Sequence, residues 1–232
     1  VLETKLVHFN RLVYFLPNKR IYKQFIQQGT PSSLNMLTMG FGSIILTYFV
    51  SHYGYQAVAG YGIGFRVEQL MLLPALGLST AVLALVSNNY GAKKFDRVYE
   101  IVKTALKYGF MISVFGIVFL LLFGEMISSI FDKDMNVIQY SMDYLLIEVW
   151  IFFAYVTLFV SISTLQAIKQ PKMIFYIGFY RQILAKFVVS YIIVKYLELD
   201  YIYLFVGMFF MIYSAAIFAY FYTNHKLKIL CK

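Results

Sequence analysis

The chain has 232 residues, of which 61% are hydrophobic and only 13% are charged. A soluble domain is about half apolar and about a quarter charged, so this composition excludes an ordinary soluble fold. The net charge of +9 could suit nucleic acid, but the bases cluster in short segments between apolar runs, which is typical of membrane proteins and argues against nucleic-acid binding. The single cysteine, Cys231, leaves no basis for a disulfide framework or a Cys/His metal site.

Residues 1–30 mix basic and apolar side chains, which predicts an amphipathic linker on the cytoplasmic surface with a turn at Pro17-Asn18. Thr30 is expected to be an N-cap and Pro31 the first residue of the following helix. Because the chain opens on Val1 with a polar segment, we expect it to be a piece of a longer protein.

Six apolar stretches follow, and each is expected to be a transmembrane helix. The second stretch would be about 50 Å long as an unbroken helix, longer than the roughly 30 Å hydrocarbon core. It must therefore tilt, bend or project, and Pro74 is the expected bend. The six predicted spans are residues 31–49, 56–89, 108–123, 144–166, 173–194 and 202–222.

The charges between the spans predict the orientation. Fifteen of the twenty Lys and Arg residues fall on one side of the predicted topology, and only Lys133 and Lys195 fall on the other. By the positive-inside rule, both ends of this segment are cytoplasmic, and the protein is a multi-pass protein of the cell (inner or plasma) membrane. The sequence thus predicts an all-α lobe over residues 31–224, followed by a basic cytoplasmic tail over residues 225–232.

Charged residues inside spans are costly, so each one suggests a function. Glu68 shares a face of small residues with Gly60, Gly64 and Ser79, a face suited to close helix packing. Arg66 lies about 160° around the same helix from Glu68, so these two side chains cannot pair with each other.

Two further spans carry polar side chains. Glu148, Tyr155 and Gln166 lie within about 20° of one line along the fourth span, as if lining a polar wall. The fifth span carries Arg181 near mid-bilayer, with Gln182 and Lys186 one turn apart. Two interpretations stay open: interhelical salt bridges that serve packing alone, such as Glu68 with Arg181 or Glu148 with Lys186, or carboxylates on a proton or ion route. No catalytic arrangement occurs, so we predict no enzyme, no catalytic residue and no metal site.

The order of several motifs resembles the multidrug and toxic compound extrusion (MATE) family of efflux transporters. The similarity covers about residues 15–195. Its motifs are GTPSS at 29–33, AGYGIGFRVE at 59–68, LPALGLSTA at 73–81, NNYGAKKFDR at 88–97, LQA at 165–167 with KQP at 169–171, and Arg181-Gln182.

The resemblance implies twelve spans in two six-helix lobes, and export of cationic or amphipathic compounds in exchange for sodium ions or protons. This chain would be the C-terminal lobe, and its main partner the N-terminal lobe of the same protein. Some members carry a cation-binding glutamate in the first helix of this lobe, whereas the matching region here, residues 37–40, has no acid. The coupling ion, H⁺ or Na⁺, therefore stays open.

We therefore predict an antiporter lobe without a cofactor, working in the lipid bilayer on a small cationic substrate. The alternatives are a related exporter of lipid-linked saccharides and a non-transporting membrane scaffold. The candidate binding residues are Glu68, Arg66, Glu148, Tyr155, Gln166 and Arg181, with Pro74 as the gating bend.

Overall fold

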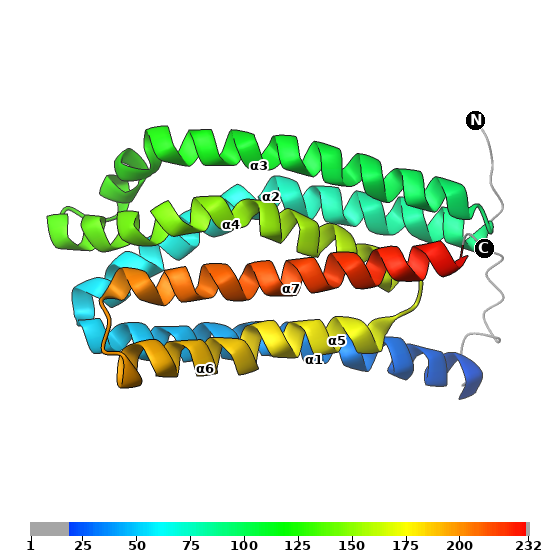
Figure 1. Ribbon diagram of the computed structural model, residues 1–232, viewed down its shortest axis with the longest axis horizontal. Helices are drawn as coiled ribbons and strands as arrows, with labels where there is room; N and C mark the ends of the chain where they lie inside the picture. Colours follow the sequence, from blue (N-terminus) through cyan, green and yellow to red (C-terminus); the bar gives the residue numbers. More distant parts are fainter. Residues whose placement is uncertain (1–18, 231–232) are drawn as a thin grey trace, which may run out of the picture.

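Long helices joined by short turns make up the computed structural model, which describes residues 19–230 and contains no strand in that range (Figure 1). The fifth helical rod, Pro171–Tyr196, is unbroken but contains two π-helical turns. In chain order the elements are α1 (Lys19–Val50), η2 (Ser51–Tyr53), α2 (Tyr55–Gly91), α3 (Phe95–Phe131), α4 (Met135–Ala167), α5 (Pro171–Phe179), η3 (Tyr180–Leu184), α6 (Ala185–Tyr191), η4 (Ile192–Tyr196) and α7 (Tyr201–Leu230).

The helices have the length and hydropathy that a bilayer requires. Five rods qualify as membrane spans: α2, α3, α4, the run Pro171–Tyr196 and α7. The 32-residue α1 occupies the position of the first predicted span. Helices α2 and α3 have 37 residues each, about 55 Å at 1.5 Å per residue, so both extend beyond the hydrocarbon core. The architecture is thus the predicted all-α membrane lobe.

One predicted helix start was wrong. Helix α1 begins at Lys19, so Thr30 and Pro31 lie inside it and do not start it. A proline inside a helix leaves one carbonyl without its usual donor, which membrane helices tolerate because water or neighbouring groups can satisfy it. At the other end of the chain, α7 continues to Leu230 and thus includes most of the predicted basic tail over residues 225–232. The expected turn at Pro17-Asn18 lies outside the described residues.

The helices form two groups joined by α7. Helices α2, α3 and α4 pack together, with α2 and α4 in the most extensive contact. Helix α1 packs along α5, η3 and α6, and makes little contact with α2. Helix α7 lies against both α4 and α6 and so links the two groups (Figure 1). A bundle of this kind holds polar side chains of α2, α4 and η3 in its interior.

Small residues allow α2 and α4 to approach closely. A Cβ added at Gly60 would lie 2.6 Å from both the Val137 carbonyl oxygen and the Tyr140 Cβ, so no larger side chain fits there. Further along, the Ser79 and Ser163 hydroxyls are 2.5 Å apart and form a hydrogen bond between the two helices. The face of α2 predicted to pack closely does so, as expected for helices that associate in lipid.

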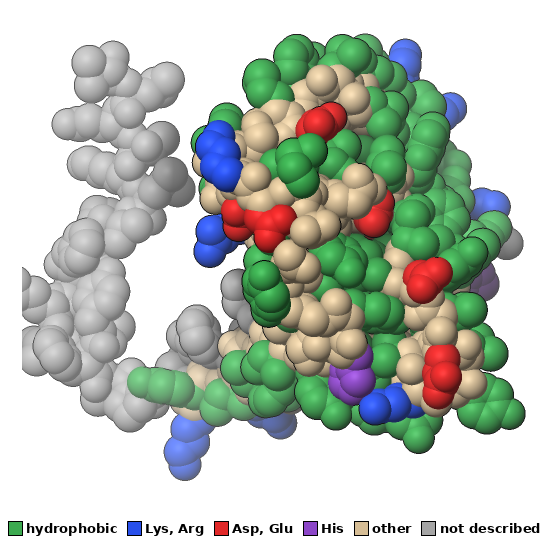
Figure 2. All heavy atoms as spheres, turned by 90° about the vertical axis from the view of Figure 1, so that its left-hand side faces the viewer, with side chains coloured by type: hydrophobic (Ala, Val, Ile, Leu, Met, Phe, Trp, Pro, Cys, Tyr) green, Lys and Arg blue, Asp and Glu red, His purple; other side chains and the backbone are tan. Residues whose placement is uncertain are grey.

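Aromatic rings close the end of the bundle at which η2 and the start of α7 lie, and acidic side chains surround it. Tyr201 of α7 packs edge-on against Tyr53, Tyr140 and Phe205, with ring centroids 4.8–5.8 Å apart. The Tyr53 hydroxyl donates a hydrogen bond to the Leu199 carbonyl at 2.8 Å, which links η2 to the turn before α7. Acidic side chains gather at this end, which Figure 2 shows face-on. The paucity of bases there is the asymmetry from which the orientation was predicted.

Candidate functional site

The centre of the site is a carboxylate held between α2 and α4. Glu68 of α2 is 2% exposed. The Tyr144 hydroxyl of α4 donates a hydrogen bond to the Glu68 Oε2 atom. Gly64, one turn before Glu68, faces the Tyr144 ring so closely that an added Cβ would collide with its Cδ1 atom at 2.5 Å. The absence of a side chain at Gly64 therefore lets Tyr144 reach Glu68.

A second carboxylate lies one helical turn further along α4. Glu148 follows Tyr144 by four residues, so both side chains project from the same face. It is 4% exposed, and its Oε2 atom has no hydrogen-bond partner in the described structure. Glu68 and Glu148 also lie within electrostatic range of each other. The site thus contains two buried acids of which one oxygen is unsatisfied.

A π-helical turn in the fifth rod brings two more polar side chains to the site. Within η3, the consecutive residues Arg181 and Gln182 are both buried, at 8% and 5% exposure. A π-turn changes which side chains face inward, and such turns are frequent at functional sites. Gly42 of α1 makes room for it, because a Cβ there would lie 2.6 Å from the Gln182 carbonyl oxygen. Arg181 Nε and Gln182 Oε1 have no partner among the described residues.

Lys186 completes the charge balance. It follows Gln182 by one turn and lies within electrostatic range of Glu68, Glu148 and Arg181. Two acids and two bases therefore lie close together, with Glu68, Glu148 and Arg181 buried and Lys186 half-buried. In the described part of the chain no direct ion pair joins any of them, and the Arg181 and Glu148 atoms named above remain unpaired. The interhelical salt bridges that were left open as one interpretation, Glu68 with Arg181 and Glu148 with Lys186, are thus not present as direct ion pairs among the described residues.

The family of the chain is decided by its sequence. A family model described as MatE matches residues 31–192, most of the chain. The chain belongs to the MatE family. This is the MATE family to which the motifs pointed, and its members are transporters, not enzymes.

Relatives of this MatE chain have names that refer to drug export. It is 27% identical over 137 residues to "Probable multidrug resistance protein YoeA" of Bacillus subtilis. It is 30% identical over 123 residues to "Multidrug export protein MepA" of Staphylococcus aureus. These matches cover 59% and 53% of this chain, but only 30% and 27% of the relatives.

Solved structures share the fold of the MatE chain. A MOP superfamily transporter from Pyrococcus furiosus matches with a TM-score of 0.88 at 23% identity, over 95% of this chain and 50% of the other. An outward-facing MATE transporter matches with the same TM-score at 22% identity, also over 95% and 50%. The chain thus spans half of each solved protein, which fits one lobe of a twelve-helix, two-lobe transporter.

Not all the predicted site residues of this MatE lobe lie together. Glu68, Glu148 and Arg181 share the buried region, and Tyr155, half-buried, lies within electrostatic range of all three. Gln166 is exposed near the end of α4. Gln166 has nearly the same angular position on α4 as Glu148, but it lies 18 residues further on, roughly 27 Å along the helix axis, and so does not reach the site.

The two remaining candidates lie on exposed surfaces. Arg66 and Glu68 project to opposite sides of α2, and of the two only Glu68 is buried whereas Arg66 is exposed. Pro74 is exposed and lines a shallow apolar groove with residues of α3. Helix α2 continues through Pro74 without interruption. Both side chains are thus exposed, unlike those of Glu68, Glu148 and Arg181.

The residues missed by sequence reasoning are Tyr144 and Tyr61, whose rings meet edge-on at 5.3 Å. The spacing of Tyr144 from Glu148 by one turn was a usable signal. The partner of Tyr144 on another helix was not predictable, because it depends on how α2 and α4 are placed relative to each other.

Proposed function

We propose that this chain is the C-terminal lobe of a secondary active antiporter that exports cationic or amphipathic small molecules in exchange for H⁺ or Na⁺. The observation that carries the proposal is the buried pair Glu68 and Glu148, adjacent to Tyr144, inside a membrane lobe. The printed names of the MatE relatives, which concern multidrug export and resistance, support the same activity.

The acid pair gives the lobe a means of binding a cation. Two neighbouring buried carboxylates repel each other, and binding of a proton or Na⁺ relieves that repulsion. Tyr144 orients one oxygen of Glu68, while Glu148 keeps an unpaired oxygen. Hydroxyl and carboxylate oxygens are hard ligands that suit either ion. Cation binding would therefore change the charge of the interior without requiring a cofactor.

The exposure of Arg66 indicates a polar cleft beside α2. It follows the start of α2 by eleven residues, roughly 16 Å, so an orientation across the bilayer places it near mid-membrane. An exposed arginine at that depth needs water or a polar partner. We infer that this face of α2 borders a central cavity shared with the N-terminal lobe. Rocking of the two lobes around that cavity would expose it alternately to each side of the plasma membrane.

The charge balance disfavours the lipid-linked saccharide exporter. An anionic cargo calls for a strongly cationic cavity, whereas the site holds two acids against two bases. A scaffold without transport activity would not need buried, unpaired charges at all.

Transport by the full-length protein in proteoliposomes tests the proposal. A cationic fluorescent dye is loaded, and either a pH gradient or a Na⁺ gradient is imposed. We expect dye movement driven by one gradient and collapsed by the matching ionophore, with empty liposomes as the control. Absence of dye movement under both gradients, or movement of a lipid-linked anion that dye does not inhibit, would contradict it.

A further inference from the structure

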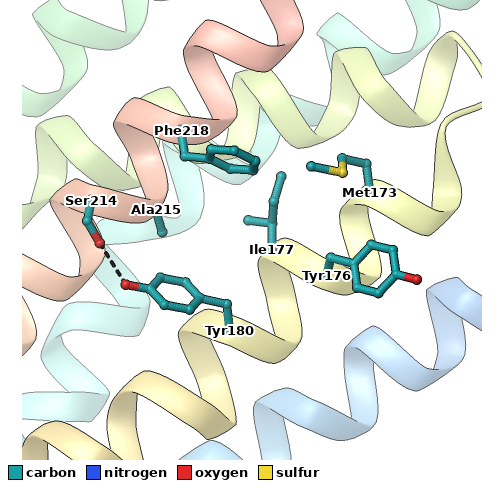
Figure 3. Close-up of a pocket in the computed structure, with 7 residues that line it drawn as sticks. All are labelled: Met173, Tyr176, Ile177, Tyr180, Ser214, Ala215 and Phe218. Carbon is teal, nitrogen blue, oxygen red and sulfur yellow. Dashed lines mark hydrogen bonds between the residues drawn. The ribbon is translucent and has the colours of Figure 1, made fainter.

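A groove lies between the fifth rod and α7, on a different side of the rod from the buried charges. It has a volume of about 450 Å³ and is lined mainly by apolar side chains, among them Met173, Ile177 and Phe218 (Figure 3). Of the three hydroxyls in the lining, those of Tyr180 and Ser214 face each other 3.1 Å apart, and the Tyr176 hydroxyl points away from them (Figure 3). The groove therefore offers an apolar body with one internally satisfied polar end.

The groove is wedge-shaped. Helix α7 packs against α6, η3 and η4, but α5 and α7 are not a packed pair. The two rods diverge from the Tyr180–Ser214 hydrogen bond toward the start of α5, as the close-up shows (Figure 3). A ligand would thus enter from the α5 end and reach inward as far as that hydrogen bond.

The open end of the wedge is basic. Lys172 is exposed and immediately precedes Met173, and it shares a helical stripe with Tyr176 and Tyr180 at four-residue steps. On α7, the line from Ala215 continues to Lys226, which lies eleven residues on and about 20° around the helix. The Lys226 ammonium lies 5.6 Å from the centroid of the Tyr222 ring. Each rod therefore carries one lysine beyond the lining residues, at the end of the groove where α5 begins.

The depth of the groove matches one leaflet. Lys172 and Tyr180 are eight residues apart, about 12 Å along the rod, and half of a 30 Å hydrocarbon core is about 15 Å. If the lysines lie at the headgroup level, the apolar lining lies beside the acyl chains and the Tyr180–Ser214 hydrogen bond lies near the midplane. The bases at this end belong to the same side as most of the basic residues of the chain.

We propose that this groove binds one anionic phospholipid. Its phosphate lies between Lys172 and Lys226, and one acyl chain fills the space between Met173, Ile177 and Phe218. The anionic charge follows from the two lysines, because basic pockets between membrane helices select acidic headgroups. The tapered apolar body follows the shape of a flexible hydrocarbon chain. The site is separate from the ion-binding role proposed for Glu68 and Glu148.

Native mass spectrometry of the full-length transporter tests this site. Delipidated protein is titrated with phosphatidylglycerol or with phosphatidylcholine of the same acyl chains, and inorganic phosphate is added as a competitor. We expect one phosphatidylglycerol to bind more tightly than phosphatidylcholine, with no displacement by phosphate. The double substitution Lys172→Gln/Lys226→Gln should weaken phosphatidylglycerol binding by about 25-fold (about 2 kcal/mol) and phosphatidylcholine binding by less, because the choline cation offsets the charge of its phosphate.

Matched variants separate the groove from general charge and packing effects. Lys93→Gln/Lys94→Gln removes two exposed bases in the α2–α3 turn and should leave the preference intact. Ala215→Phe fills the groove and should abolish tight binding of both lipids, whereas Ile217→Phe, on the exposed opposite side of α7, should not. Equal affinity for the two lipids in the unmodified protein would overturn the proposal. So would an unchanged preference in the Lys172/Lys226 variant, which alters no buried side chain and tests the site even if Ala215→Phe does not fold.

Discussion

Gly60 is the position at which the contact between α2 and α4 can be tested most sharply. Replacing it with alanine adds one methyl group that would lie 2.6 Å from the Val137 carbonyl oxygen, 2.6 Å from the Tyr140 Cβ and 2.9 Å from the Ser141 backbone nitrogen. Ordinary contacts of this kind are 3.4–4 Å. Because two of the three neighbours are backbone atoms, no side-chain rotation relieves the clash, and the helices must separate by about an ångström.

The size of the effect follows from known costs of overpacking. Inserting a methyl group into a packed core costs about 1–3 kcal/mol. For a domain of this size that corresponds to a fall in Tm of about 2–12 °C. Gly62→Ala is the matched control, because a Cβ at Gly62 meets nothing within 4 Å and the helix position is only two residues away. It should keep or slightly raise Tm, since alanine favours helix over glycine.

Thermal unfolding of the purified full-length protein in detergent, followed by fluorescence-detected size-exclusion chromatography, gives the two midpoints. We expect Gly60→Ala to unfold at a lower temperature than the unmodified protein and Gly62→Ala not to. If both alanine variants unfold at the same temperature, α2 and α4 do not approach each other at Gly60 and the helix packing described above is wrong.

Three further predictions concern hydrogen bonds. Tyr144→Phe leaves buried Glu68 without its hydroxyl donor and should lower the free energy of unfolding by about 1.5–3 kcal/mol, seen as a lower Tm; an unchanged Tm would refute the bond. In a double-mutant cycle of Ser79→Ala and Ser163→Ala, the coupling energy should be about 0.6 kcal/mol, typical of bonds between membrane helices, and strictly additive losses would argue against it. The pKa of Asp134 lies below its usual value because its carboxylate accepts hydrogen bonds from a glutamine side chain and from the backbone of α4. Because the folded-state pKa is lowered, the ionised Asp134 stabilises the protein above the unfolded pKa of 3.8, and this stabilisation is lost as the pH falls through the folded-state pKa. The Asp134→Asn variant should therefore have a lower Tm than the unmodified protein at pH 7, and the two Tm values should converge toward pH 3. A Tm difference that does not shrink on acidification would contradict this prediction.

The membrane architecture was largely predictable, because a bilayer imposes length and hydropathy on each span. The limits of α2 moved by only one or two residues, from 56–89 to Tyr55–Gly91. The start of α1 was missed because a Thr-Pro pair is a good N-cap signal in water, yet a helix already formed upstream can continue through it. A local N-cap motif does not show whether the residues before it are already helical.

The site was predictable helix by helix but not across helices. Periodicity placed Glu68 and Arg66 on opposite sides of α2 because both lie on one helix, but it did not predict which of them is buried. It did not exclude Gln166, because an angular match says nothing of distance along the axis. It also did not predict the π-turn at Tyr180–Leu184, where Arg181 and Gln182 are both buried although they are adjacent in sequence. This π-turn packs against α1, and such contacts between helices cannot be predicted from the local sequence.

The most direct test of the central claim measures gradient-driven dye efflux by the full-length transporter against pH, with Glu68→Gln, Glu148→Gln and both together. The account predicts that each substitution lowers efflux, and that the double variant loses the pH or Na⁺ dependence because no buried carboxylate remains to bind the cation. Gln166→Ala, at an exposed position far from the acid pair, is the control and should retain both. If Glu68→Gln and Glu148→Gln both leave transport and its pH dependence unchanged, the acid pair is not the coupling site.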